Sequence, residues 1–276
     1  MFLAAANKFL GTNHFIFLGI CIVIVVTSLI IFKKKNVSFN TVLNIMLVVA
    51  VLSELIKIGE YIEPYTNEAG KVIGVYFNKE GLPFHLCSIQ IIFLFIVRIC
   101  KEGSFKNKLL AFQYPTAFLG ALLALMLATI TIEFDRPLAW QYFLYHACLL
   151  VYGIYIPMSK VVKIDTKMFL NTCVCLIGLF LVSIYINGLI AVPSQDVINS
   201  AGEVIGQTEG MYVWFFYSTK PPIENLPILN LDNGWFVYIL SILAIGIIAV
   251  TLVHIPFLVK DYKEYKQKKK EVLAKN

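Results

Sequence analysis

The stretch "FLGTNHFIFLGICIVIVVTSLIIF", Phe9–Phe32, contains no Asp, Glu, Lys or Arg. A membrane-spanning helix needs roughly 20 mainly apolar residues, and this run supplies them without interruption. A basic cluster, "KKK" at Lys33–Lys35, follows directly, and no small-residue cleavage site is evident. The run therefore predicts a spanning helix and not a cleaved signal peptide.

The composition of the whole chain is typical of a membrane protein. Of its 276 residues, 59% are hydrophobic and only 14% are charged, and the mean hydropathy is +0.78. Soluble domains contain about 25% charged residues. The pattern predicts an all-α, polytopic protein whose single transmembrane domain, 1–276, is a bundle of seven helices. The expected helices cover residues 14–32, 41–62, 82–99, 109–131, 138–158, 168–191 and 233–258.

The distribution of basic residues predicts the orientation of the bundle. Seventeen Lys and Arg residues flank one end of the predicted helices, and five flank the other. The more basic side of a membrane protein is the cytoplasmic one. We therefore expect a multi-pass protein of the cell (cytoplasmic) membrane, with its N-terminus outside and a basic cytoplasmic tail, 259–276. Because the net charge of +6 arises in these flanks, we expect membrane lipids and no nucleic acid as partners, and protein partners are left open.

One predicted connection is much longer than the others. The outer loop 192–232 contains "MYVWFFYSTKPP", Met211–Pro222, which is too aromatic for a disordered linker. Loops of this length are commonly functional. Two interpretations stand side by side. The first is an aromatic belt at the membrane interface, and the second is a lid over an outward-facing polar cavity, in which Tyr217 and Lys220 would contact the substrate.

Six polar residues are expected at one depth, in the outer half of the bundle. A rise of about 1.5 Å per residue places them roughly 5–12 Å below the outer helix ends. Ionisable side chains are costly inside a membrane and mark functional sites by default. Each also has a structural interpretation, such as ion pairing along one helix face or burial of a thiol as a small hydrophobe. The six are Glu54, Lys57, His85, Cys87, His146 and Asn187.

These side chains favour acid–base or nucleophilic chemistry. They include too few carboxylates for a magnesium or calcium site, and we expect neither a metal nor a cofactor. A histidine can act as a general base near neutral pH, and Cys87 is a nucleophile that it could activate. If 82–99 forms one helix, the side chains of His85 and Cys87 diverge by about 200°, so only one faces the site. Burying an unpaired imidazole costs more free energy than burying a thiol, so His85 is favoured as the residue that faces the site.

Four stretches of the sequence resemble a known family. "LPFHLCSIQIIFL", "FQYPTAFLGALLALM", "FLYHACLLVYGIY" and "YSTKPP…GWFVYILSILAIGIIAVTLVHIPF" occur in this order between Leu82 and Phe257. They resemble the YwaF-like bacterial integral membrane proteins. That family is similar to a eukaryotic TMEM-type acyltransferase that remodels ether phospholipids and, more distantly, to the androgen-induced membrane hydrolases. The resemblance implies a nucleophile on one helix and a histidine on a later one, with His146 at the histidine position.

The chain departs from the eukaryotic pattern at the nucleophile. There a cysteine immediately precedes the histidine of the "LPFH" stretch; here that position is Phe84, and the nearest thiol is Cys87. The residues and the resemblance together predict a lipid acyltransferase or ester hydrolase acting on phospholipid or lysophospholipid. His146 would be the base, and the nucleophile would be either Cys87 or a water activated by His146 and His85. A permease subunit for a small solute and a non-catalytic scaffold are the alternatives.

Overall fold

The structure, a computed structural model, describes residues 10–67, 70–128, 130–191, 196–198, 204–207, 215–218, 229 and 231–275. It is mostly helical, and within these residues six helices are long and apolar enough to cross a membrane. The protein is therefore polytopic. The six are α2 (Thr12–Lys34), α3 (Phe39–Glu60), α5 (Ser104–Met126), α6 (Pro137–Ser159), α7 (Thr166–Ile190) and α8 (Trp235–Lys275). A shorter apolar helix, α4 (Leu86–Ile99), has 14 residues.

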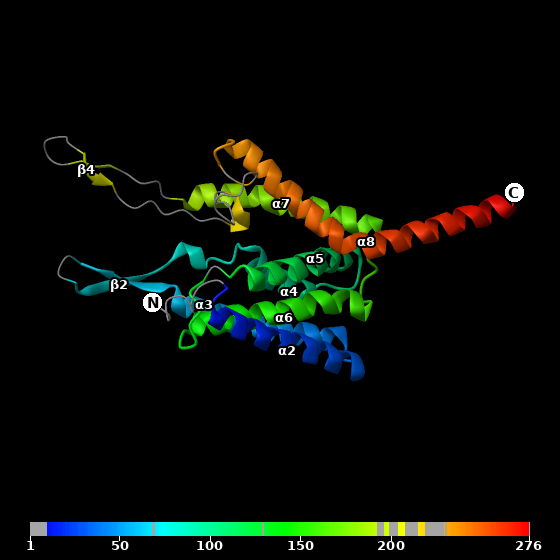
Figure 1. The fold of residues 1–276 in the computed structure, drawn as a ribbon, viewed down its shortest axis with the longest axis horizontal. Helices are drawn as coiled ribbons and strands as arrows, with labels where there is room; N and C mark the ends of the chain where they lie inside the picture. Colours follow the sequence, from blue (N-terminus) through cyan, green and yellow to red (C-terminus); the bar gives the residue numbers. More distant parts are fainter. Residues whose placement is uncertain are drawn as a thin grey trace.

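The helices pack side by side around α6 and α5. α6 contacts α2, α3 and α5, while α4 packs against both α3 and α5. α7 and α8 pack against each other and against α5, on the side away from α2 (Figure 1). Two β-hairpins protrude from one end of the bundle, and the last turns of α8 protrude from the other (Figure 1).

The backbones of α5 and α6 touch at Gly153. A Cβ atom at this position would lie 2.7 Å from the backbone nitrogen of Phe118, closer than side chains approach. Glycine is therefore required for this packing. Gly153 lies seven residues after His146 on α6, so this contact positions the helix that carries the predicted base.

Pro115, inside α5, leaves a backbone carbonyl without its helical partner. Proline has no N–H, so the carbonyl of Ala111, four residues earlier, loses its usual hydrogen bond. The hydroxyl of Thr172, on α7, lies 3.2 Å from this oxygen and 3.0 Å from the carbonyl oxygen of Met168. A neighbouring helix thus re-satisfies the freed group, as membrane helices require.

The hairpins are a departure from the all-α prediction. β1 (Ile62–Thr66) pairs antiparallel with β2 (Val72–Phe77), and β3 (Asp196–Ile198) pairs with β4 (Val204–Gln207). The first hairpin forms because its strands are rich in β-branched and aromatic residues. Gly70, with a φ of +73°, allows the turn between them.

The first hairpin is also tied together by side chains. Glu63 on β1 accepts hydrogen bonds from the Asn78 amide at 2.8 Å and the Tyr76 hydroxyl at 2.5 Å. These two hydrogen bonds lower the pKa of the Glu63 carboxyl below its ordinary value, and the one from Asn78 has the larger effect. The hydrogen bonds join the two strands at the end nearer to the bundle.

α4 and α8 differ in length from their predictions. α4 begins at Leu86 and not at residue 82, because Pro83 disfavours helical backbone in the residue before it. α8 continues to Lys275, through most of the tail predicted at 259–276. That segment is rich in Lys, Glu and Gln, which are strong helix formers, and Lys260 lies 4.0 Å from Glu264 one turn later.

Candidate functional site

A mostly buried ion pair on α3 forms one wall of the site. Lys57 Nζ lies 2.6 Å from Glu54 Oε1, and the two side chains are 11% and 21% exposed. Their spacing of three residues places both on one face of the helix. The same ammonium donates to Ser88 Oγ on α4 at 3.4 Å. The pair therefore faces the bundle and links α3 to α4.

His146 is buried on α6, and the backbone holds one of its two ring nitrogens. Its Nδ1 lies 2.6 Å from the carbonyl oxygen of Tyr142, one turn earlier. A carbonyl only accepts, so Nδ1 carries a proton and donates it. The other nitrogen, Nε2, is buried and has no hydrogen-bond partner among the described residues. In the neutral ring this nitrogen presents a lone pair, as a general base requires.

The thiol of Cys87, in the first turn of α4, lies beside His146. It interacts with the imidazole of His146 and the hydroxyl of Ser88, and the ammonium of Lys57 is close enough to act on it electrostatically. The approach to His146 falls short of ordinary hydrogen-bond geometry, since Nε2 has no such partner in the described part of the chain. The hydroxyl of Tyr145 donates to the Cys87 carbonyl at 2.8 Å and holds this turn of α4 against α6.

His85 reaches the same site because it precedes the helix. Its backbone is extended, with φ −68° and ψ 152°, at the N-cap of α4. The separation of about 200° expected for two helical residues two apart therefore does not apply to His85 and Cys87. The His85 imidazole interacts electrostatically with both Lys57 and His146. The premise of that prediction, that both residues lie within one helix, is therefore wrong, and the rule no longer assigns only one of them to the site.

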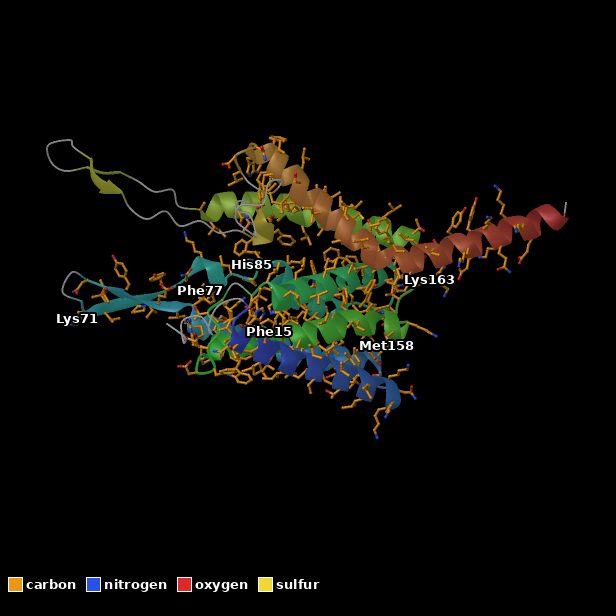
Figure 2. All side chains as sticks on the ribbon, viewed as in Figure 1. Phe15, Lys71, Phe77, His85, Met158 and Lys163 are labelled. Carbon is orange, nitrogen blue, oxygen red and sulfur yellow. The ribbon has the colours of Figure 1, made fainter. Side chains whose placement is uncertain are left out.

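Asn187 does not join the other five residues. It is fully buried on α7, where its side chain hydrogen-bonds the backbone of Phe215 in the outer loop. Phe215 opens a short 3-10 turn, η2 (Phe215–Tyr217), and its ring meets the His85 ring edge-on, with centroids 4.8 Å apart. Figure 2 marks His85 toward the hairpin end of the bundle, with Met158 at the other end. A described piece of the loop 192–232 thus covers His85.

The two predicted substrate contacts of the outer loop lie outside what can be described. The backbone of Tyr217 belongs to η2, but its side chain is outside the described residues, and so is the whole of Lys220. Among the described residues, no group of three or more His, Cys, Asp and Glu side chains could hold a metal ion.

Sequence reasoning missed four residues of the site: Ser88, Tyr142, Tyr145 and Phe215. Ser88 and Tyr142 had a usable signal. Ser88 lies three residues after His85 in a polar segment. Tyr142 lies four residues before His146, and at this spacing in a helix its carbonyl can accept a hydrogen bond from the His146 side chain. Phe215 lies in the aromatic segment Met211–Pro222 that was interpreted as a possible lid, but nothing in the sequence singled it out there as the neighbour of His85, 130 residues away.

No curated protein and no solved structure matches the sequence of this chain. One family does match, over residues 9–254, a range that contains every residue of the site described above. Because this range covers most of the chain, the protein belongs to the TMEM164 family, as a multi-pass membrane member.

Proposed function

We propose that the protein moves acyl groups between membrane lipids, or releases them to water, through a thioester on Cys87. The observation that carries this proposal is the thiol of Cys87 beside His146, whose Nε2 has no hydrogen-bond partner in the part of the chain that the structure describes and can accept a proton. The ammonium of Lys57 would stabilise the thiolate that forms. A thiolate is the reactive form of cysteine, and a neighbouring base and cation are the usual means of producing it.

The reaction would have two balanced halves. In the first, His146 takes the thiol proton and the Cys87 sulfur attacks the ester carbonyl of a phospholipid. The C–S bond forms, the ester C–O bond breaks, and the departing alkoxide takes the proton from His146 and leaves as a lysophospholipid. In the second, the hydroxyl of an acceptor lysophospholipid, or water, gives its proton to His146 and attacks the thioester. The new C–O bond forms, the C–S bond breaks, and the departing Cys87 sulfur takes the proton from His146, which restores the thiol.

Two further observations support lipid transfer. Phe215 covers His85 at the outer end of the site, and a site that excludes water protects a thioester from hydrolysis. The resemblance of the sequence to YwaF-like proteins and to eukaryotic acyltransferases of ether phospholipids supports a phospholipid substrate. We keep hydrolysis as the outcome when water replaces the acceptor.

The proposed topology has seven crossings, with α4 as the seventh, in the cell (cytoplasmic) membrane. Its N-terminus and hairpins would face outside. The support is the excess of Lys and Arg at the end of the bundle opposite to the hairpins. The site would then open toward the outer leaflet.

The experiment uses purified protein, a phospholipid donor and a lysophospholipid acceptor. Cys87→Ala and His146→Ala should each lower transfer by at least about 100-fold, which is typical for loss of a nucleophile or base. Cys100→Ala is the matched control, since this free thiol follows the other end of α4, and it should leave the rate unchanged. Intact-protein mass spectrometry should find an acyl adduct that hydroxylamine removes.

Two results would contradict the proposal. Full activity of Cys87→Ala, with no adduct, would replace the thioester by direct attack of a water or lipid hydroxyl activated by the histidines. Full activity of His146→Ala would remove catalysis from this site altogether.

A further inference from the structure

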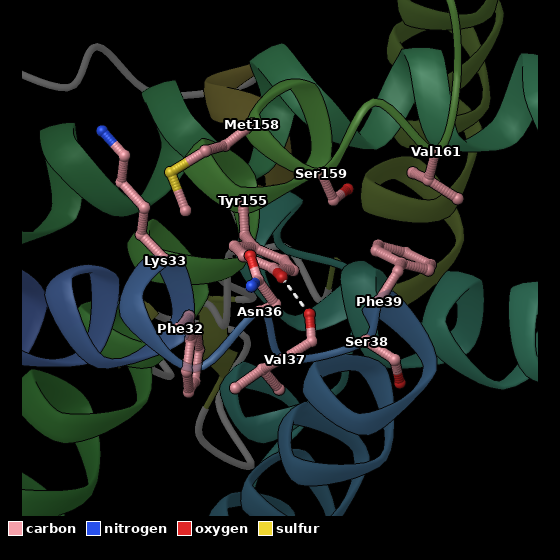
Figure 3. Close-up of a pocket in the computed structure, with 10 residues that line it drawn as sticks. All are labelled: Phe32, Lys33, Asn36, Val37, Ser38, Phe39, Tyr155, Met158, Ser159 and Val161. Carbon is pink, nitrogen blue, oxygen red and sulfur yellow. Dashed lines mark hydrogen bonds between the residues drawn. The ribbon is translucent and has the colours of Figure 1, made fainter.

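A pocket of about 400 Å³ lies at the end of the bundle opposite to the hairpins. It is formed by the end of α2, the beginning of α3 and the end of α6 (Figure 3). Small-molecule sites commonly have volumes of about 300–1,000 Å³, so it is large enough for part of a lipid or a small anion. None of the residues proposed for acyl transfer lines it.

One side of the pocket is polar and positively charged. Lys33, Asn36 and Ser38 line it. The side chain of Ser38 accepts from the Thr41 N–H, and the first turn of α3 contains no acidic residue. By the general rule for helix starts, the amides of Phe39 and Asn40 have no intrahelical acceptor. A lysine together with the positive end of a helix is suited to an anion such as phosphate.

The other side of the pocket is apolar and held in shape. Phe32 and Tyr155 meet edge-on with ring centroids 5.5 Å apart, and Met158 lies on the same wall. The hydroxyl of Tyr155 donates to the carbonyl of Val37, the bond drawn as a dashed line in Figure 3. This bond ties the loop between α2 and α3 to α6. An apolar wall next to a cationic one fits an amphiphile better than a free ion.

The lysines at this end also have a simpler role. Lys33 and Lys34 lie in the last turn of α2, where positive charge stabilises the negative end of a helix. That role treats the two residues alike, and so does general attraction to an anionic membrane surface. The pocket distinguishes them, because Lys33 is the only member of the cluster Lys33–Lys35 that lines it.

We infer that this pocket binds the phosphate headgroup of an anionic membrane lipid. Lys33 and the start of α3 contact the phosphate. The apolar wall of Phe32, Tyr155 and Met158 contacts the first carbons of the lipid chains. The site is separate from acyl transfer and does not depend on it. It would hold a lipid of the leaflet at the lysine-rich end.

The test measures lipid binding to the full-length protein in detergent by native mass spectrometry. Dioleoyl phosphatidylglycerol is titrated, with dioleoyl phosphatidylcholine, whose phosphate is offset by its choline cation, as the control lipid of zero net charge. Lys33→Gln, Lys34→Gln and Lys35→Gln each remove one charge from the same cluster. Lys33→Gln should weaken phosphatidylglycerol binding about tenfold, the effect of losing one charge-assisted hydrogen bond. Lys34→Gln and Lys35→Gln should change it less than about twofold.

A second variant tests the pocket without changing its charge. Ser159→Phe should fill part of the space from the α6 side and weaken phosphatidylglycerol binding while Lys33 remains. Competition by glycerol 1-phosphate identifies the source of the phosphate. If glycerol 1-phosphate displaces phosphatidylglycerol at matched concentration, the site binds phosphate and its ligand is a soluble phosphate ester. If it does not, the ligand is the membrane lipid.

Three results would overturn the inference. Equal losses in Lys33→Gln, Lys34→Gln and Lys35→Gln would reduce the effect to general attraction. Unchanged binding in both Lys33→Gln and Ser159→Phe would place the lipid elsewhere. Equal binding of phosphatidylcholine and phosphatidylglycerol would remove the role of the charge.

Discussion

Asn187 holds Phe215 through both atoms of its side-chain amide. Its Nδ2 donates to the Phe215 carbonyl at 3.0 Å, and its Oδ1 accepts from the Phe215 N–H at 3.1 Å. Nδ2 also donates to Ser218 Oγ at 2.6 Å. The ring of Phe215 in turn lies against His85. Asn187, which was expected to support the reacting groups, therefore does not contact them directly and instead holds the segment that covers His85.

Replacing Asn187 by Leu should uncover the site. The change removes these hydrogen bonds and leaves the buried Phe215 N–H without the acceptor it has here, at a cost of about 1–3 kcal/mol, whereas the Phe215 carbonyl keeps its hydrogen bonds from Ser218. If the site transfers acyl groups, water should gain entry, and the ratio of hydrolysis to transfer should rise several-fold. Product analysis by mass spectrometry measures this ratio. Asn171→Leu, on α7 but near its other end, is the control, and an unchanged ratio in Asn187→Leu would exclude the covering role.

The buried pair of Glu54 and Lys57 predicts a non-additive effect on stability. Glu54→Leu should be strongly destabilising, by about 3–5 kcal/mol, because it leaves a buried ammonium without its partner. The double variant Glu54→Leu/Lys57→Met should recover most of this loss, since two apolar side chains replace both charges. Thermal unfolding in detergent measures the difference. A double variant less stable than Glu54→Leu would show that Lys57 has another essential partner.

The contact at Gly153 predicts a packing defect from a single methyl group. Gly153→Ala should force α5 and α6 apart, because the new Cβ would lie 2.7 Å from the Phe118 nitrogen. Overpacking of this kind costs about 1–3 kcal/mol. Gly178→Ala on α7 is the matched control, since nothing lies within 4 Å of a Cβ built there. Equal melting temperatures for the two variants would refute the close approach of the backbones.

The proposed topology predicts the result of reporter fusions. Reporters placed in 33–40, 101–108 and 160–167 should report the cytoplasm, while one in the turn of the first hairpin, near Gly70, should report the outside. The physical reason is the retention of Lys and Arg on the cytoplasmic side. Placement of 33–40 and 101–108 on opposite sides would mean that α4 does not cross.

The sequence predicted the helices better than the segments between them. A long apolar run such as Phe9–Phe32 needs only membrane thickness to be identified as a spanning helix, and α2 (Thr12–Lys34) confirms it. The start of α4 was misplaced because residues 82–85 continue the apolar run of the helix. Their backbone is not helical: Pro83 disfavours helix in the residue before it, and His85 is extended. The first hairpin was missed because hydropathy alone does not detect strands outside the membrane.

The site was predictable from depth but not from direction. Glu54, Lys57, His85, Cys87 and His146 were grouped because each was expected about one to two turns below the predicted outer helix ends, and the structure brings them together. Asn187 has the same depth but faces the outer loop. Helix rotation decides between these cases, and it depends on packing partners such as Gly153 and Phe118 that a single sequence does not identify.

If α4 crosses the membrane, as proposed above, its short length has a consequence for the bilayer itself. Its 14 residues span about 21 Å, against a hydrocarbon thickness of about 30 Å, and Ile92, Phe95 and Ile99 are exposed on one face. Such a hydrophobic mismatch is relieved by local thinning of the membrane. Lipids beside α4 would then sit deeper than their neighbours, with their ester groups displaced toward the level of Cys87. Bilayers of longer acyl chains would resist that displacement, so membrane thickness itself would set how often a lipid reaches the site.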